Sequence, residues 1–117
     1  MNWNKLTSEE QIDQVITESA EKPVLLFKHS TSCSISSMSL DRLSRNWKAE
    51  DSDKITPYYL DLIAYRKLSN LVAERFGIHH ESPQVLLIQK GKVTYHESHY
   101  GISYAEIMKQ SSWISDF

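Results

Sequence analysis

Cysteine is scarce in this sequence of 117 residues, and because Cys33 is the single example, no disulfide can form within the chain. Secreted proteins of this size commonly carry paired cysteines, and the segment Met1–Leu6 lacks the apolar stretch of a signal peptide. No apolar run approaches the ~20 residues that a helix needs to cross a bilayer. We therefore expect a cytoplasmic protein with no membrane partner.

The chain also lacks a surplus of charge of either sign. Its 13 basic and 15 acidic residues give a net charge of −2, and no basic cluster indicates a nucleic-acid partner. The three glycines and three prolines occur singly, so the sequence contains neither a glycine-rich phosphate loop nor a flexible linker. Hydrophobic residues make up 40% of the chain, which is enough for a packed core. We expect a single domain over residues 1–117.

What the sequence does contain is an alternation of helical and strand patterns. Apolar residues three or four positions apart indicate helices, whereas short apolar runs indicate strands. The expected elements are, in order, a helix from Thr7 to about Glu21, a strand at Val24–Phe27, a helix from Cys33 to about Ala49, a strand at Ile55–Leu60, a helix through Leu68–Phe76, strands at Val85–Ile88 and Val93–His96, and a helix after Ser103. Thr7 and Glu10 have the spacing of a capping box, and Gly77 is suited to a left-handed helix end.

This α-β-α-β-α-β-β-α order predicts the class of fold. A strand–helix–strand unit has parallel strands and a right-handed crossover, whereas the hairpin turn at Lys90–Gly91 makes its two strands antiparallel. The sequence therefore predicts an α/β protein with a four-stranded mixed sheet and helices on both faces. The unbroken apolar run Val24–Phe27 is typical of a strand covered on both faces, and Pro57 indicates an edge strand.

The chemistry of the sequence centres on Cys33. It follows a buried strand and lies in the first turn of a helix, where unpaired backbone N–H groups and the helix dipole favour a thiolate, the nucleophilic form of cysteine. The hydroxyl groups of Thr31, Ser32 and Ser36 are close enough in sequence to hydrogen-bond the sulfur. The alternative is a buried cysteine that packs as a small apolar residue, and position alone leaves both interpretations open. The polar turn around Cys33 weighs against the second.

A second feature is Ser82–Pro83, shortly before the strand at Val85–Ile88. A cis bond at such a proline exposes the backbone of the preceding residue to an extended substrate or to the tail of a thiol cofactor. The trans bond is the commoner geometry of an X–Pro pair. The pair alone therefore favours the trans form, and only the wider sequence pattern described below leads us to hypothesise the cis form, with Pro83 packed against the sulfur of Cys33.

Other polar residues give weaker signals. Metal-ligating residues gather in the second half of the chain, at His79, His80, Glu81, His96 and His99. Adjacent histidines on a loop reach one ion only in awkward geometry, so no metal site is expected. Lys28 and His29 end the first strand close to Cys33. Because alternate side chains of a strand face opposite ways, at most one of the two points toward the cysteine.

Several of these segments together resemble a known family. A thioredoxin-like C-terminal half is indicated by Phe76–Ile78, Pro83, Lys90–Val93 and Tyr100–Ser103. In thioredoxins the corresponding proline is cis and packs against the active-site cysteine. A second cysteine follows the first by three residues in those proteins, and here that resolving position is Ser36. The chain therefore resembles a monothiol relative.

The closer resemblance is to the monothiol bacilliredoxin family of low-GC Gram-positive bacteria. It is carried by Phe27–Cys33, Ile35–Ser36 and Glu81–Ile88, and it extends roughly from Leu25 to Ile107. Ser34 stands where members of that family tend to have proline. The resemblance implies a thioredoxin-like fold and a thiol–disulfide oxidoreductase that removes bacillithiol from protein mixed disulfides.

The resemblance also implies roles for particular residues. Cys33 and Ser36 are the expected catalytic residues. The expected substrate-binding residues are Thr31, Ser32, Ser82, Pro83 and Gly101. Cys33 attacks the bacillithiol sulfur, and a second thiol then reduces the adduct, so bacillithiol is a co-substrate and no cofactor is tightly bound. The implied partners are bacillithiolated client proteins and a low-molecular-weight thiol.

A different class of function is also compatible with the sequence. The chain would then be a non-catalytic thioredoxin-like adaptor that binds a partner through the Ser82–Pro83 surface, with Cys33 incidental. Loss of exchange activity on removal of the thiol distinguishes the enzyme from this adaptor.

Overall fold

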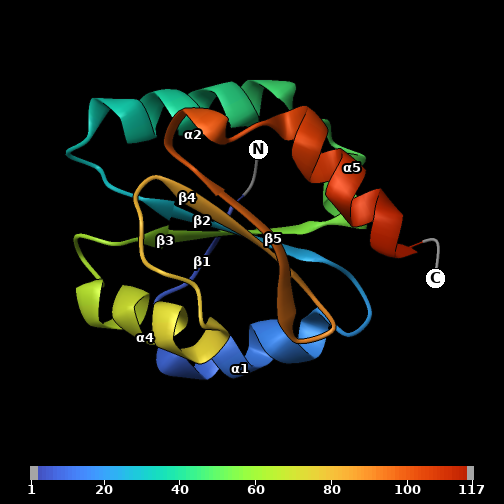
Figure 1. The fold of residues 1–117 in the computed structure, drawn as a ribbon, viewed down its shortest axis with the longest axis horizontal. Helices are drawn as coiled ribbons and strands as arrows, with labels where there is room; N and C mark the ends of the chain where they lie inside the picture. Colours follow the sequence, from blue (N-terminus) through green and yellow to red (C-terminus); the bar gives the residue numbers. More distant parts are fainter. Residues whose placement is uncertain (1–2, 116–117) are drawn as a thin grey trace.

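The structure, a computed structural model, describes residues 3–115 and contains one mixed sheet between two layers of helices (Figure 1). The sheet has five strands in the order β1-β3-β2-β4-β5. The β1–β3 and β2–β3 pairs are parallel, whereas the β2–β4 and β4–β5 pairs are antiparallel. The strands are β1 Asn4–Lys5, β2 Val24–His29, β3 Thr56–Asp61, β4 Gln84–Gln89 and β5 Lys92–Ser98.

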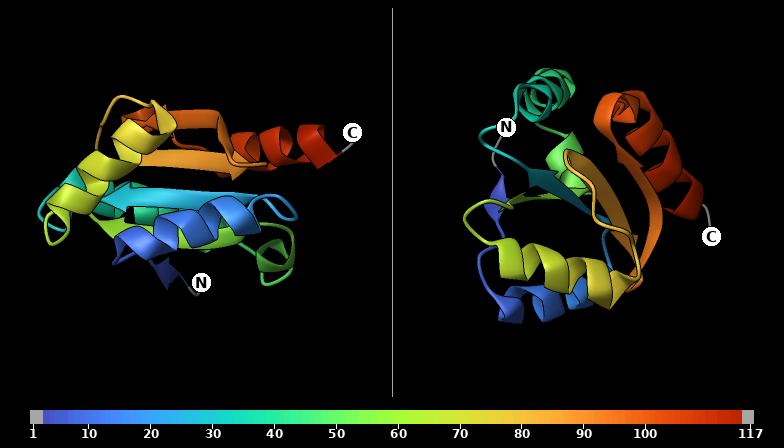
Figure 2. Two further views of the ribbon diagram at one scale, coloured as in Figure 1. Left: turned by 90° about the horizontal axis from the view of Figure 1, so that it is seen from below. Right: turned by 60° about the vertical axis from the view of Figure 1, so that its left-hand side comes forward.

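The helices cover both faces of the sheet, as the two views of Figure 2 show. One layer consists of α1 and α4, and the other contains α2 and α5. The helices are α1 Glu9–Glu18, α2 Ser34–Asn46, α3 Asp51–Lys54, α4 Arg66–Phe76 and α5 Tyr104–Ser115, with a 3-10 turn η1 at His99–Gly101. The predicted α/β class, with a mixed sheet and helices on both faces, is confirmed.

Each face of the sheet has its own apolar core, because alternate side chains of a strand point to opposite faces. Leu26 of β2 packs in the core beneath α1 and α4, whereas its neighbour Phe27 packs in the core beneath α2 and α5. Every residue of β2 and β4 is buried, which explains the unbroken apolar runs Val24–Phe27 and Val85–Ile88 within them. Full burial of one such aliphatic side chain contributes about 2 kcal/mol to stability.

Two expectations for the sheet are wrong. The sequence predicted four strands, but β1 adds a fifth, and its two exposed polar residues carry no apolar pattern. Pro57 lies in β3, between β1 and β2, rather than on an edge. The N–H of Thr56 donates toward β2, to the carbonyl of Pro23, and the carbonyl of Tyr59 accepts from Leu6 on the other side. The backbone N–H that proline lacks would therefore point toward the short strand β1, and no hydrogen bond to β2 is lost at Pro57.

The helix boundaries differ from the sequence prediction by one to a few residues. Ser8, rather than Thr7, is the N-cap of α1. Gln11 takes the place expected for Glu10, and its Oε1 accepts the N–H groups of Ser8 and Thr7 at 3.1 and 2.6 Å. Cys33 is the N-cap of α2, whose first helical residue is Ser34, and α2 ends at Asn46.

The two predicted turns are confirmed. Gly77 ends α4 with a φ of 69°. Lys90 and Gly91 join β4 to β5 with φ values of 52° and 78°, the doubly left-handed turn whose twist matches that of the flanking strands. Glycine tolerates this region freely, whereas Lys90 adopts it at some cost in strain.

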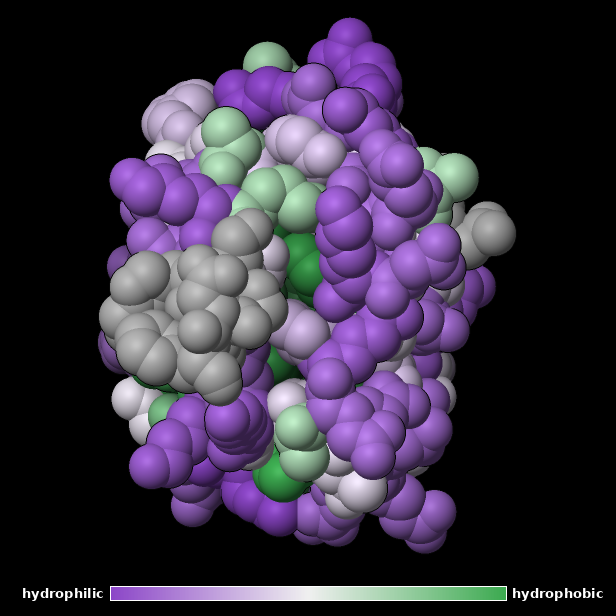
Figure 3. Space-filling model, turned by 90° about the vertical axis from the view of Figure 1, so that its right-hand side faces the viewer, coloured by the Kyte–Doolittle hydropathy of each residue, from purple (hydrophilic) through white to green (hydrophobic). Residues whose placement is uncertain are grey.

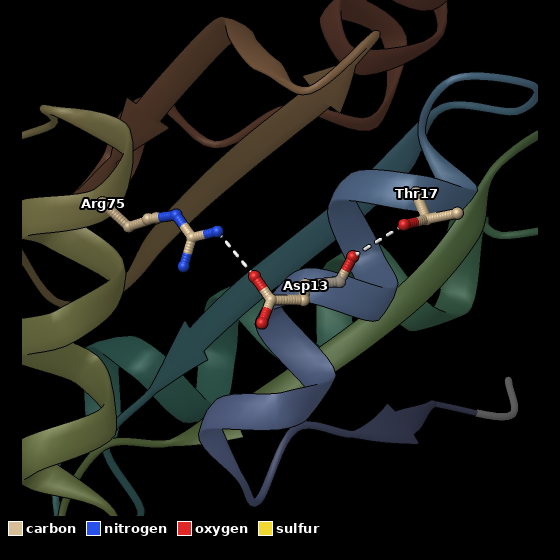
Figure 4. Close-up of polar contacts among 3 residues, drawn as sticks. All are labelled: Asp13, Thr17 and Arg75. Atoms are coloured by element: carbon tan, nitrogen blue, oxygen red, sulfur yellow. Dashed lines mark hydrogen bonds and ion pairs between the residues drawn. The ribbon is translucent and has the colours of Figure 1, made fainter.

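The helices α1 and α4 lie side by side and are joined by an ion pair (Figure 4). Nη2 of Arg75 lies 2.5 Å from Oδ1 of Asp13, and the Thr17 hydroxyl donates to the main-chain oxygen of Asp13 at 3.1 Å. Because both charged side chains are largely exposed, the pair contributes only about 0–1 kcal/mol. Packing of the two helices on the sheet is the larger contribution.

The outer surface is largely hydrophilic on the side that Figure 3 shows, the end of the molecule away from the start of α2. No helix within residues 3–115 is long and apolar enough to cross a membrane. Among the described residues, large exposed apolar side chains occur near the start of α2 and on η1, where Met38 is 68% and Tyr100 is 75% exposed, and between β3 and α4, at Ile63 and Tyr65.

Candidate functional site

Three segments of the chain meet at one end of the sheet. The loop after β2 leads into α2, the loop after α4 leads into β4, and η1 follows β5 (left side of Figure 1). The N–H of His99 in η1 donates to the carbonyl of Pro83 at 2.9 Å, and η1 packs against α2. Residues far apart in the sequence, Cys33, Pro83 and Gly101, are thus brought to the same end of the molecule.

Cys33 is the N-cap of α2 and adopts an extended backbone conformation with φ −106° and ψ 119°. Its N–H donates to the carbonyl of Ser30, and its own carbonyl accepts the N–H of Ser37, both at 3.1 Å. The side chain is half-buried. An N-cap side chain lies beside the first N–H groups of a helix, which have no partners within the helix and are suited to an anionic sulfur.

Ser36 lies one helical turn after Cys33 and faces the sheet. It is fully buried, its Oγ lies 2.7 Å from Nδ1 of His29, and it accepts the N–H of Ser30 at 3.0 Å. The Ser36 hydroxyl and Nδ1 of His29 share one hydrogen bond, in which the donor depends on the tautomer of the imidazole. The hydrogen bonds of the Ser36 hydroxyl are with His29 and Ser30, and the expected bond to the sulfur of Cys33 stays a prediction.

His29 is the residue of β2 that points toward α2, as the alternation of strand side chains requires. It is buried at 6% exposure, and its ring packs near those of Phe27 and Tyr59, with centroids 6.1 and 5.5 Å away. Burial lowers the pKa of His29, although the charge of Asp61 opposes that shift. His29, Ser36 and Asp61 are the residue types of a hydrolase triad, but the full burial of Ser36 keeps any substrate from its hydroxyl.

The Ser82–Pro83 bond is cis, as the sequence analysis hypothesised. Pro83 is buried and lies one residue beyond the last β2–β4 pair, Lys28 with Gln84. It therefore lies across from the end of β2, where the chain turns toward Cys33. The Oγ of Ser82 is buried and has no hydrogen-bond partner among the described residues. Direct contact between Pro83 and the sulfur of Cys33 stays a prediction.

The remaining expected site residues lie on the exposed rim of this end. Thr31 and Ser32 are exposed in the loop before Cys33. Gly101 is exposed in η1, and a Cβ built on it would lie 2.5 Å from the Cδ of Glu97. The glycine thus leaves room for that carboxylate. Their roles in substrate binding stay predictions.

Lys28, the neighbour of His29, points to the opposite face of the sheet and is fully buried there. Its Nζ donates to the carbonyl of Ser69 in α4 at 3.2 Å and lies 3.4 Å from Nδ1 of His80. Burial lowers the pKa of Lys28 to about 8. Sequence reasoning found that only one of Lys28 and His29 faces the cysteine, but it missed the partners of both.

The histidine-rich segments do not converge on one ion in the part of the chain that is described. No group of three or more His, Cys, Asp or Glu side chains with metal-binding geometry occurs within it. The ring of His80 turns inward to Lys28 and Ser69, and Glu81 accepts a hydrogen bond from the hydroxyl of Ser98. These side chains therefore have structural partners.

A groove of about 140 Å³ runs along α2 beside η1. Its lining includes Ile35, two residues after Cys33, together with Met38, Arg42 and Tyr100. Exposed apolar side chains thus border the segment that carries the cysteine, on the side where η1 lies.

These features define a class of protein: a thioredoxin-fold domain with one cysteine at the N-terminus of the helix after its central strand and a cis proline at the same end. The chain belongs to a particular family within that class, because residues 4–107 match the family described as monothiol bacilliredoxin BrxC. The fold and family are those of thiol oxidoreductases.

Solved structures agree with this assignment. A protein described as a candidate oxidoreductase with a thioredoxin fold is 31% identical, with a TM-score of 0.79 over 92% of this chain and 91% of that one. Thioredoxin from Malassezia sympodialis is 15% identical, with a TM-score of 0.73 over 96% of this chain and 90% of its own. A poplar thioredoxin h mutant is 19% identical, with a TM-score of 0.71 over 98% and 84%. The last two similarities establish the fold alone.

Proposed function

We propose that this protein removes bacillithiol from protein mixed disulfides through Cys33. The observation that carries the proposal is the placement of one half-buried cysteine at the N-cap of α2, at the same end of the sheet as the cis Ser82–Pro83 bond. Membership in the monothiol bacilliredoxin family supports bacillithiol as the thiol that is removed. The reducing cytoplasm, in which free thiols persist, is the compartment that fits this chemistry.

In the first step, the Cys33 thiolate attacks the bacillithiol sulfur of the client mixed disulfide. A disulfide forms between Cys33 and bacillithiol, the original disulfide breaks, and the client cysteine leaves as a thiolate that takes a proton from water. The client segment pairs with the backbone of Ser82 and covers the exposed side chains of Met38 and Tyr100. Thr31, Ser32 and Gly101 border the bacillithiol part.

The second step needs a thiol from outside the chain, because the hydroxyl of Ser36 cannot form a disulfide. A low-molecular-weight thiol attacks the bacillithiol sulfur of the adduct, forms a new disulfide with it and restores the Cys33 thiolate. Bacillithiol is thus a co-substrate, and the cycle requires neither a metal nor a tightly bound cofactor.

The test is to incubate the protein with a bacillithiolated client and to measure release of the client thiol by mass spectrometry under thiol-trapping conditions. The parent protein should release the client and carry bacillithiol on Cys33. Cys33→Ser should release none, while its free energy of unfolding stays within about 1 kcal/mol of the parent value, because a half-buried N-cap side chain loses little packing. Binding of the client without release by the parent would identify an adaptor instead.

A further inference from the structure

Lys28 is a buried cation that takes no part in the proposed thiol–disulfide exchange at Cys33. It is 0% exposed in the last part of β2, on the face opposite to α2. Its hydrogen-bond partners within the described residues are the carbonyl of Ser69 and the imidazole of His80, and neither is a carboxylate. A buried ammonium group without an anionic partner costs free energy that an apolar side chain of similar length would avoid. Its presence therefore calls for a role beyond packing.

The contacts of Lys28 connect α4 to the loop that precedes β4. Nδ1 of His80 lies 3.4 Å from Nζ of Lys28 and 3.3 Å from Oγ of Ser69. An ammonium group only donates, so Nδ1 of His80 accepts and the imidazole is neutral, with its proton on Nε2. Lys28 and Ser69 are both buried, and together they fix this ring from two directions.

The same loop carries Ser82–Pro83 two residues later. A second hydrogen bond holds the same loop. Gln84 pairs with Lys28 across the sheet, and its Nε2 donates to the carbonyl of His79 at 3.0 Å. The path of residues 78–82 is thus set by contacts from the α4 face of the sheet, whereas Cys33 and Ser36 are held from the α2 face. The two edges of the site have separate supports.

We propose that Lys28 is a positioning residue that, through His80, holds the Ser82–Pro83 segment in the place where it pairs with the client chain. The kinetic part of this proposal rests on the proposed function. Lys28 supports client binding and leaves the intrinsic reactivity of Cys33 unchanged, because it lies on the other side of the sheet from α2.

The first test uses variants of His80, which is only half-buried and whose replacement leaves the core intact. His80→Leu removes the acceptor, whereas His80→Asn places an oxygen close to the position of Nδ1 and should restore the bond. His79→Leu, at the exposed neighbouring residue, is the matched control. Amide hydrogen exchange of residues 78–82 should accelerate about tenfold in His80→Leu and stay near the parent rate in the other two variants. Equal exchange in His80→Leu and the parent would overturn the proposal.

Lys28→Met is the second variant, and it should accelerate exchange in residues 78–82 to the same extent as His80→Leu. If Lys28→Met does not fold, the three variants of the loop decide the question. Acceleration over the whole domain in a folded Lys28→Met, with none specific to residues 78–82, would contradict a local positioning role.

The functional readout separates binding from reactivity. His80→Leu should raise the KM for a bacillithiolated client about fivefold with kcat within about twofold of the parent, and His80→Asn should restore the KM. Alkylation of Cys33 by iodoacetamide should proceed at the parent rate in every variant. Unchanged KM in an active His80→Leu, or slower alkylation, would overturn the proposal. If the parent protein shows no thiol–disulfide exchange with the client, the proposed function is contradicted. Amide hydrogen exchange still decides in that case whether Lys28 holds the loop.

Discussion

Lys28 and His29 are adjacent, both are buried, and they support opposite edges of the same site. His29 faces α2 and bonds to Ser36, seven residues away. Lys28 faces α4 and reaches Ser69 and His80, which are 41 and 52 residues away. The cysteine edge is therefore held by a local contact, and the proline edge by contacts that exist only once the whole sheet has formed.

The two supports also differ in charge. On the α2 face, a neutral imidazole and a hydroxyl satisfy one another, and the N–H of Ser30 fills a second position on the hydroxyl oxygen. On the α4 face, Lys28 is an ammonium group at neutral pH, because burial lowers its pKa only to about 8. Buried neutral groups can thus satisfy most of one another's hydrogen-bonding capacity. A buried cation instead lowers the free energy of unfolding by an amount that depends on pH.

The largest expected effect on stability is the pH dependence that Lys28 introduces. The pKa of Lys28 is about 8 in the folded protein against 10.5 for the free side chain, so between these pH values the unfolded chain binds more protons. The contribution of Lys28 to the free energy of unfolding therefore rises as the pH increases from the folded-state pKa to the unfolded-state pKa. Relative to Lys28→Met, the parent should gain roughly 3 kcal/mol between pH 7 and pH 11, and the variant should be at least as stable as the parent at pH 7.

Urea denaturation of both proteins at several pH values measures this difference. Tyr58 and Tyr104 have pKa values raised to about 12 and lower the stability at high pH, but they do so equally in both proteins and cancel in the difference. A difference that stays constant from pH 7 to pH 11 would show that Lys28 ionises as an exposed lysine does.

A smaller effect is expected on the α2 face from Ser36→Ala. Loss of the hydroxyl leaves the imidazole of His29 and the N–H of Ser30 without their partner, which should cost about 2 kcal/mol in the free energy of unfolding. Ser37→Ala, at the exposed neighbouring position of α2, is the matched control and should change stability by less than about 0.5 kcal/mol. Equal stability of the two variants in urea denaturation would contradict the bond between Ser36 and His29 as a stabilising contact.

The sequence was sufficient for most of the fold because its elements are locally encoded. Apolar runs gave the buried strands, and Gly77 and Lys90–Gly91 marked real turns. The strand β1 was missed because its two residues are polar and exposed, so its pairing with β3 has no local pattern. Pro57 was wrongly assigned to an edge strand, because a proline shows only that one backbone N–H is absent from the strand. The neighbouring strand on that side, β1, is only two residues long.

The site was predictable to the extent that it depends on position along the chain. The place of Cys33 at a helix start follows from the local pattern. The cis bond at Ser82–Pro83 was predicted from the thioredoxin-like resemblance, because an X–Pro pair alone favours the trans form. Proximity in the sequence predicted that the hydroxyl of Ser36 lies near Cys33, but it did not reveal that this serine faces inward to His29. The partners of Lys28 were inaccessible to sequence reasoning, because they come from α4 and from the next loop.

A smaller change in stability than that of Ser36→Ala is expected from Ser36→Cys, although Ser36→Cys should change the chemistry most clearly. Sulfur replaces oxygen in the same buried place, so the reduced variant should stay within about 1 kcal/mol of the parent. The first turn of a helix permits the Cα distance of less than about 7 Å that a disulfide requires. After loading with bacillithiol, the variant should expel it and form an internal disulfide with Cys33, as mass spectrometry would show.

His29, 2.7 Å from the hydroxyl that is replaced, is placed to take the proton of the new thiol. Adding His29→Leu should therefore slow the release by at least about tenfold, whereas adding Lys28→Met should leave it unchanged, because Lys28 lies on the other face. Retention of bacillithiol by Ser36→Cys would mean that position 36 cannot reach Cys33, and equal slowing by both second substitutions would remove the distinction between the two faces.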